Sequence, residues 1–192
     1  MIVYTDMHIF GAHPKIHEPL TFGPDTFYIG DIVDLKNCPK SQIPEARKLI
    51  EHIEKNAGDN YLPGNHELSY GNKPFIKYNR VLLTHGDMFF WPQKKIVHWR
   101  GGGIKAGMSL PLWLTFRLKN YFRELLPKNI CPEAYKRIYE TATAPAHKCH
   151  TVIIGHEHPS QILKKTYAQN NGPPIDLYIL PRGRHVLDIQ IN

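Results

Sequence analysis

The stretch Thr26-Phe-Tyr-Ile-Gly-Asp-Ile-Val-Asp34 decides the fold of this chain. A short, largely apolar strand pattern stops at Gly30, and two aspartates, Asp31 and Asp34, follow at once. The same order of a strand and then a polar cluster recurs at four further places, after residues 1–5, 60–62, 80–84 and 151–154. In α/β proteins the reactive groups lie on loops beyond the carboxyl ends of the strands, so we expect the five clusters to meet at one edge.

The other clusters carry the same kinds of side chain. They read Asp6-Met-His8, Pro63-Gly-Asn-His-Glu67, Thr84-His-Gly-Asp87 and Gly155-His-Glu-His158. Each cluster is a weak signal alone, since an Asp-x-His pair or a Gly-Asp turn arises often in unrelated proteins. Five of them in order at strand ends are improbable by chance. Carboxylates, imidazoles and an amide oxygen suit manganese, iron or zinc, and no thiolate stands among them, so the clusters predict a divalent-cation site.

In this order the clusters resemble the signature of the calcineurin-like metallophosphoesterase family, which runs DxH, GDxxD, GNH(D/E), His and GHxH. The resemblance extends from Asp6 to His158 and to the flanking strands, apart from an internal segment. It implies an α/β fold in which two packed sheets and flanking helices form a four-layer αββα sandwich with a helical lid. It also implies two divalent ions, Mn²⁺ ahead of Fe or Zn, held roughly 3.5–4 Å apart.

The resemblance assigns the metal ligands one by one. It makes Asp31 the bridge between the two ions. It places three residues on one ion, Asp6, His8 and His158, and three on the other, Asn65, His85 and His156. Glycines beside these ligands are expected to permit tight backbone turns close to the ions, namely Gly30, Gly64, Gly86 and Gly155.

The activity that the resemblance implies is hydrolysis of a phosphoester or pyrophosphate bond by a metal-activated hydroxide. His66 matches the family's histidine that contacts the phosphate and protonates the leaving group, and Asp34 would orient its ring. Asn65 is expected to contact the substrate as well. Three further acids of the motifs are given no chemical role: Glu67, Asp87 and Glu157.

Secondary structure beyond the clusters is predicted from periodicity. Apolar residues at helical spacing indicate an amphipathic helix over 41–56, with Ser41 as its N-cap and Gly58 beyond its end. After the last cluster, strands are expected over 161–169, 176–180 and 185–191. The length, with no internal repeat, favours a single domain over residues 1–192.

Positive charge and aromatic side chains concentrate in residues 88–150. The whole chain has a formal net charge of +7, whereas this segment holds 11 Lys and Arg against three acids, a net of +8. All three Trp also lie in it. Because the segment separates the fourth cluster from the fifth, it is a candidate lid over the site. Its apolar spacing predicts helices over 110–126, with Arg117 and Arg123, and over 133–141.

Three interpretations of residues 88–150 stay open. The basic side chains form a solvated face over packed aromatics, bind an acylated substrate or membrane surface, or line a nucleic-acid groove. Leu and Phe dominate over the polar residues of base readout, which favours lipid over nucleic acid. The Leu-Pro-Leu start at 110–112 and the basic helix resemble the lid of the UDP-2,3-diacylglucosamine hydrolases, and Arg117 and Arg123 would then contact the substrate. That branch commonly has Arg where His66 stands, which leaves the substrate open. The segment Gly155-His-Glu-His-Pro159 resembles some nuclease-like relatives of the family, and a nuclease or cyclic-nucleotide phosphodiesterase is the alternative, ahead of a non-enzymatic scaffold.

Cysteine content and the N-terminal pattern bear on location. The three cysteines have no CxxC spacing and predict no disulfide framework. The first residues do not form a signal-peptide pattern, and no run of about 18 apolar residues occurs. We therefore expect a cytoplasmic protein, at most peripheral at the inner membrane surface.

Overall fold

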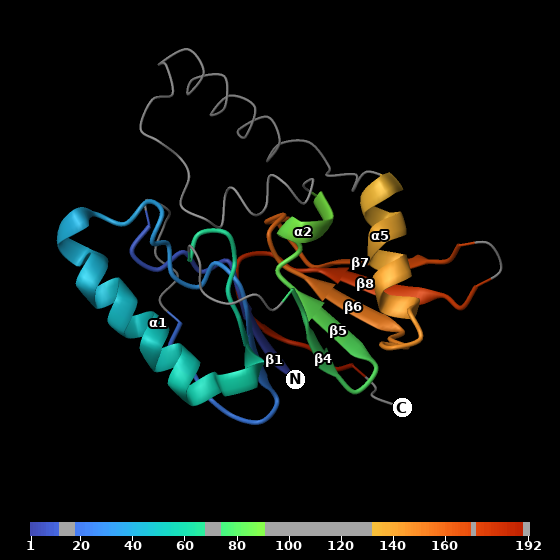
Figure 1. Cartoon of the computed structure of the whole chain (residues 1–192), viewed down its shortest axis with the longest axis horizontal. Helices are drawn as coiled ribbons and strands as arrows, with labels where there is room; N and C mark the ends of the chain where they lie inside the picture. The colour runs from blue at the N-terminus through green and yellow to red at the C-terminus, as the bar shows by residue number, and fades with distance from the viewer. Residues whose placement is uncertain (12–17, 68–73, 91–131, 170–171, 190–192) are drawn as a thin grey trace, which may run out of the picture.

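The computed structural model describes residues 1–11, 18–67, 74–90, 132–169 and 172–189, and the strands within these ranges form two mixed sheets (Figure 1). The first sheet has the order β3-β2-β1-β9. Its strands β1, β2 and β3 are parallel, and β9 is antiparallel to β1. Their bounds are Ile2–Thr5 for β1, Thr26–Ile29 for β2, Tyr61–Leu62 for β3 and Gly183–Val186 for β9.

The second sheet has the order β4-β5-β6-β8-β7. Its central strands β5, β6 and β8 are parallel, and the outer strands β4 and β7 are antiparallel to their neighbours. The bounds are Ile76–Tyr78 for β4, Val81–Thr84 for β5, Thr151–Ile154 for β6, Leu163–Tyr167 for β7 and Ile175–Ile179 for β8. The mixed α/β class expected from the sequence is confirmed.

Apolar side chains join the two sheets face to face. Phe27 and Ile29 of the first sheet share a buried cluster with Leu83 and Ile153 of the second. Successive side chains of a strand point to opposite faces, so Tyr28, between Phe27 and Ile29, joins a separate cluster on the outer side. All four residues of β2 are buried for this reason, which accounts for its nearly continuous apolar pattern.

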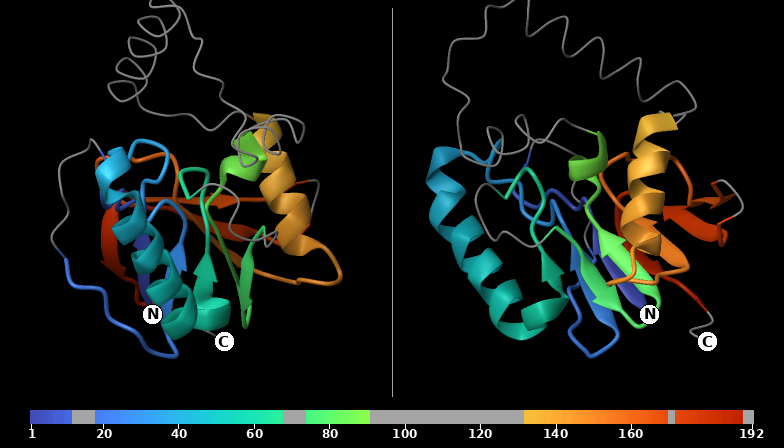
Figure 2. Two further views of the ribbon diagram at one scale, coloured as in Figure 1. Left: turned by 60° about the vertical axis from the view of Figure 1, so that its left-hand side comes forward. Right: turned by 45° about the vertical axis from the view of Figure 1, so that its right-hand side comes forward.

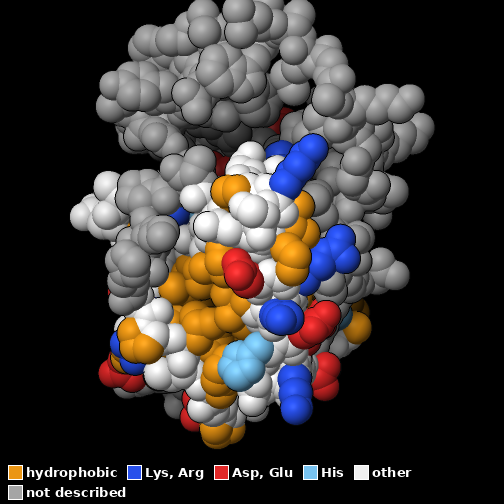
Figure 3. All heavy atoms as spheres, turned by 90° about the vertical axis from the view of Figure 1, so that its left-hand side faces the viewer, with side chains coloured by type: hydrophobic (Ala, Val, Ile, Leu, Met, Phe, Trp, Pro, Cys, Tyr) orange, Lys and Arg blue, Asp and Glu red, His pale blue; other side chains and the backbone are white. Residues whose placement is uncertain are grey.

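Two helices cover the outer faces of the sheets. Helix α1 (Ile43–Ala57) buries Ala46, Ile50 and Ile53 against the first sheet. Helix α5 (Pro132–Thr143) packs against the second sheet through a cluster that includes Ile138. In both views of Figure 2 these helices lie on opposite sides of the strands. Figure 3 shows that hydrophobic side chains also gather in a hollow on the face that carries α1.

The predicted helix over 41–56 is confirmed as α1, but its predicted N-cap is wrong. Ser41 lies in a 3-10 turn (Lys40–Gln42), and Gln42 is the N-cap, without a side-chain hydrogen bond. A proline in the first turn of α1 supplies the fixed φ angle that favours a helix start. Gly58 ends the helix at a φ of 52°, as expected.

The other strands and helices predicted from periodicity agree with the structure only in part. The expected strands over 161–169 and 176–180 are confirmed as β7 and β8, and the helix over 133–141 as α5. The strand expected over 185–191 is wrong in its bounds, because β9 ends at Val186. Neither β4 nor the short helix α2 (Asp87–Phe90) was expected, and each is too short for a periodic signal.

The segment between the fourth and fifth clusters is described only in part. The helix expected over 110–126, with Arg117 and Arg123, lies outside the described residues. Among the residues that are described, no helix combines the length and apolar character needed to cross a bilayer.

Candidate metal centre

The five polar clusters meet at one edge, where the carboxyl ends of β1, β2, β3, β5 and β6 lie together (Figure 1). Their side chains form three overlapping groups, and within each group the potential ligand atoms lie within 4.8 Å of one another. The groups are Asp6, His8 and His158; His8, Asp31 and His66; and Asp31, His85 and His156. The predicted convergence of the clusters is therefore confirmed.

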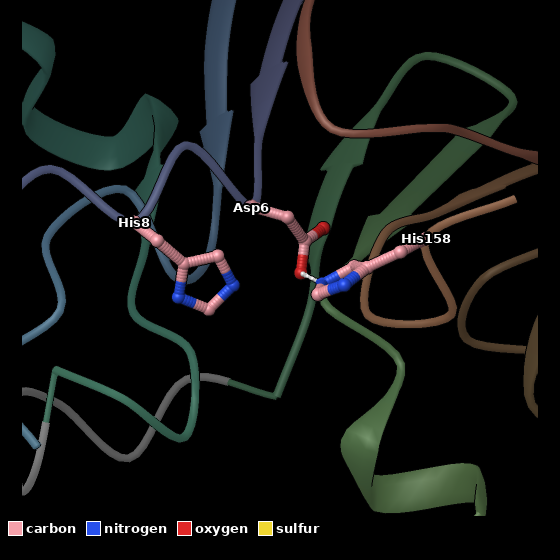
Figure 4. Close-up of side chains that lie close together, drawn as sticks. All are labelled: Asp6, His8 and His158. Carbon is pink, nitrogen blue, oxygen red and sulfur yellow. Dashed lines mark hydrogen bonds and ion pairs between the residues drawn. The ribbon is translucent and has the colours of Figure 1, made fainter. Parts of the chain in front are cut away.

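The first group is built around the buried carboxylate of Asp6. Figure 4 shows this carboxylate between the rings of His8 and His158, which enter from separate loops. The Nε2 of His158 lies 2.7 Å from Oδ1 of Asp6. The backbone N–H of His156 and the Thr5 hydroxyl both donate to Oδ2. Burial would raise the pKa of Asp6, but His158 and His85 outweigh it and hold the pKa below its usual value.

The group of Asp31, His85 and His156 surrounds one ring nitrogen of His85. Its Nδ1 lies 3.2 Å from the backbone carbonyl of Ile29, which can only accept, so the ring donates there. Its Nε2 then faces Asp31 Oδ2 at 3.3 Å, Asn65 Oδ1 at 3.2 Å and His156 Nδ1 at 3.1 Å. Several electron-pair donors around one point repel one another unless a cation or a proton lies between them. This donor set fits a divalent cation, with the carbonyl fixing the orientation of the His85 ring.

The pKa values of the two histidines in this group diverge. Burial lowers the pKa of His85, but Asp31 and Asp6 outweigh burial and raise it to about 10. Burial and the charge of His85 lower the pKa of His156 to about 3, so His156 is neutral at pH 7. A neutral imidazole is the form that binds a metal, and the anionic surroundings of His85 show how strongly this position favours positive charge.

Asp31, like His8, belongs to two of the three groups, and its carboxylate offers the two oxygens that a bridging ligand requires. Its side chain is 2% exposed. One carboxylate oxygen lies beside His85, and the other accepts from the backbone N–H of His66 at 2.7 Å. Burial would raise the pKa of Asp31, yet His85 and His66 hold it well below the usual value. The side chain is thus an anion at neutral pH.

His66 and Asp34 form a pair at the more open side of the centre. His66 Nδ1 lies 2.8 Å from Asp34 Oδ1, and the His66 side chain is 17% exposed. Asp34 is fully buried, accepts from the backbone and side chain of Asn37, and lies 3.5 Å from His8 Nδ1. Burial lowers the pKa of His66, but Asp31 and Asp34 raise it above its usual value. The structure confirms the predicted Asp34–His66 contact.

Backbone strain concentrates in the ligand loops. Five of the seven expected ligands have a positive φ: Asp6, His8, Asp31, His156 and His158. Non-glycine residues rarely adopt this region, and such residues cluster at functional sites. Of the four expected glycines, Gly30 and Gly86 also have positive φ. Gly64 and Gly155 instead leave space, because a Cβ there would overlap Asp31 or Thr5 and Asp6.

Replacement of Gly155 by alanine is expected to weaken metal binding. The added Cβ would overlap Thr5 Oγ1 and displace the Asp6 carboxylate. Overpacking of this kind costs about 1–3 kcal/mol. The matched control is Gly23→Ala, whose Cβ would meet Thr26 Oγ1 at an ordinary 3.6 Å and should change stability by less than about 0.5 kcal/mol. Thermal unfolding and Mn²⁺ titration check both variants, and equal behaviour of the two would contradict the space argument.

Three charged residues beside the centre were not predicted as part of it. The Glu67 carboxylate accepts backbone N–H groups from the ligand loops. Arg182 donates through Nε to the Asp6 carbonyl at 3.0 Å and through Nη2 to the Met7 carbonyl at 3.4 Å. Burial lowers the pKa of Lys36, although the nearby carboxylates of Asp31 and Asp34 act to raise it. Glu67 follows the Gly-Asn-His motif, but Arg182 lies outside every motif and has no sequence signal.

All seven expected ligands, together with His66 and Asp34, lie within the described residues and share this edge. The expected substrate contacts Arg117 and Arg123 lie outside them. Some carboxylates and imidazoles in these groups could hold a metal ion, and no cysteine belongs to the groups found among the described residues. No family model and no curated protein matches the chain.

Proposed function

We propose that this chain is a dinuclear metal-dependent phosphoesterase of the calcineurin-like type. The observation that carries the proposal is that the potential metal ligands from five loops lie together at one edge of the sheets. The three ligand groups overlap at His8 and Asp31, and one of their histidines, His66, is held by the buried carboxylate of Asp34. A purely structural metal site uses closed sets of ligands and has no need for a partly exposed, oriented histidine. A scaffold that binds only partners would not need one either.

In this proposal one ion would be held by Asp6, His8 and His158 and the other by Asn65, His85 and His156, and Asp31 would be shared by both. Two divalent ions, Mn²⁺ ahead of Fe or Zn, would supply Lewis acidity toward phosphate oxygens and lower the pKa of bound water. The chain's own residues do the rest. Asn65 and His66 bind the phosphate, and His66 gives its proton to the leaving oxygen while Asp34 keeps the ring in place.

The packing of the described elements supports a four-layer αββα arrangement. Three separate buried clusters, one at each interface between layers, support the order α1, first sheet, second sheet and α5. The helical lid proposed for residues 88–150 falls mostly on residues outside the described ranges. A whole-chain single domain remains part of the proposal.

The substrate class we favour is an amphiphilic nucleotide-lipid such as UDP-2,3-diacylglucosamine, cleaved at its pyrophosphate near the inner membrane surface. Support comes from the basic, aromatic composition of residues 88–150. Within the described part of that segment, Lys136 and Arg137 are exposed on α5. The alternative substrates are single-stranded nucleic acid and cyclic nucleotides, which the same cations and basic side chains would also accommodate.

Metal-dependent hydrolysis is the first test. Chelator-treated protein should not hydrolyse p-nitrophenyl phosphate or its bis-ester, and Mn²⁺ should restore activity in proportion to about two bound ions. His158→Ala should remove most of this activity, whereas His52→Ala, an exposed histidine on α1, should leave it unchanged. Protein that binds Mn²⁺ yet hydrolyses no phosphate ester would refute the proposed function. Rates on UDP-2,3-diacylglucosamine, single-stranded DNA and cyclic nucleotides then rank the substrates, and DNA cleavage without turnover of the lipid would reverse our order.

A further inference from the structure

Glu67 lies fully buried beneath the ligand loops, where its carboxylate accepts four backbone N–H groups. Oε2 accepts from Asp31 at 2.9 Å and from Gly64 at 2.5 Å. Oε1 accepts from Ile32 at 2.7 Å and from Val33 at 3.0 Å. Each oxygen therefore serves two donors, and the acceptor capacity of the carboxylate is largely used.

The four donors belong to two different loops. Asp31, Ile32 and Val33 lie in the loop after β2, and Gly64 lies in the loop after β3. These loops carry Asp31 and Asp34 on one side and Asn65 and His66 on the other. Buried N–H groups without partners are costly, and a single carboxylate group accepts from all four here. The loops are thus tied together through one side chain.

We propose that Glu67 is a positioning residue that sets the distance between the bridging Asp31 and the Asn65–His66 turn without binding a cation itself. It belongs to none of the ligand groups found among the described residues, and both its oxygens are directed at N–H groups. The inference rests on the proposed function, since it assigns Glu67 a role in the geometry of that same metal centre.

Glutamine has nearly the same shape as glutamate but different hydrogen-bonding groups, so its substitution for Glu67 tests the proposal with little change in packing. In the variant Glu67→Gln, the side-chain amide has one acceptor oxygen and one NH₂ donor group. If its oxygen stays with Ile32 and Val33, its NH₂ faces the N–H groups of Asp31 and Gly64, and donors then oppose donors. The hydrogen bonds lost are therefore one to the loop after β2 and one to the loop after β3. A shorter aspartate keeps both acceptor oxygens and should restore part of the contact.

The experiment compares Mn²⁺ affinity of Glu67→Gln, Glu67→Asp and the wild-type chain by isothermal titration, below the unfolding temperature of each. We expect Glu67→Gln to weaken Mn²⁺ binding about 10–100-fold, as loss of a supporting contact to a metal ligand does, and Glu67→Asp to lie between. Glu51→Gln, an exposed site on α1, is the charge control. Ile138→Val in the α5 core is the stability control, since it destabilises the fold from a buried cluster that contains no residue of either loop.

A merely structural role for Glu67 would lower the unfolding temperature while the folded protein kept wild-type Mn²⁺ affinity, as Ile138→Val should. That result would overturn the inference. If Glu67→Gln does not fold, Glu67→Asp decides, because its Mn²⁺ affinity must fall below that of Ile138→Val. Wild-type protein that binds Mn²⁺ but has no hydrolytic activity would refute only the proposed function. Equal affinity of wild type and Glu67→Gln would refute only the role of Glu67.

Discussion

Replacement of Asp31 by asparagine is expected to remove the second equivalent of bound Mn²⁺ and to lower kcat/KM by at least about 10³-fold. Asparagine keeps the size of the side chain, so the packing around this buried position changes little. It removes the negative charge that is shared between two ligand groups. Two cations at close range without an anion between them repel strongly, and only one should remain bound.

The Asp31→Asn prediction is checked by metal content and kinetics on the same protein sample. Atomic absorption gives the number of Mn²⁺ ions per chain, and p-nitrophenyl phosphate gives the rate. Asp188→Asn, an exposed carboxylate away from the centre, should match the wild type in both measurements. If Asp31→Asn or Asp31→Ala retains its full metal content, Asp31 does not bridge and the dinuclear proposal is wrong.

The ligand loops could be predicted from sequence because each one is a local pattern. The strand and its polar cluster are adjacent in the chain, as Ile29 and Asp31 are, and the sheet carries the cluster to its edge. Their order along the chain then identifies which clusters belong together. The two sheets and their outer helices likewise follow from runs of apolar residues, as in β2 and α1.

The parts that sequence did not predict depend on contacts between distant segments. A glutamate after a Gly-Asn-His turn suggests a surface acid, and only the fold brings Glu67 to the N–H groups of Asp31 and Val33. Arg182 reaches the carbonyl of Asp6 across 176 residues. The positive φ of ligands such as His158 is also invisible in sequence, because tertiary contacts enforce it against the intrinsic preference of the residue.

Replacement of His66 by alanine is expected to lower kcat roughly 10²–10⁴-fold on alkyl phosphoesters while the bound Mn²⁺ stays unchanged. An alkoxide leaves poorly without a proton, whereas p-nitrophenolate leaves readily, so the loss on p-nitrophenyl esters should be much smaller. Asp34 and Asp31 raise the pKa of His66, so the imidazolium persists to a higher pH than in a free histidine. Asp34→Asn should therefore shift the alkaline limb of the rate profile to lower pH.

The metal content of His66→Ala distinguishes a metal-binding role of His66 from a proton-donating role. Its ring also lies in the group with His8 and Asp31, where a ligand atom of each is within 4.8 Å of the others. If His66 binds a cation, His66→Ala loses metal and activity together, and the rate falls by a similar factor on all substrates. If it donates a proton, metal stays and the loss grows with the basicity of the leaving group. The hydrogen bond of 2.8 Å to Asp34 and the partial exposure of the His66 side chain favour the proton donor.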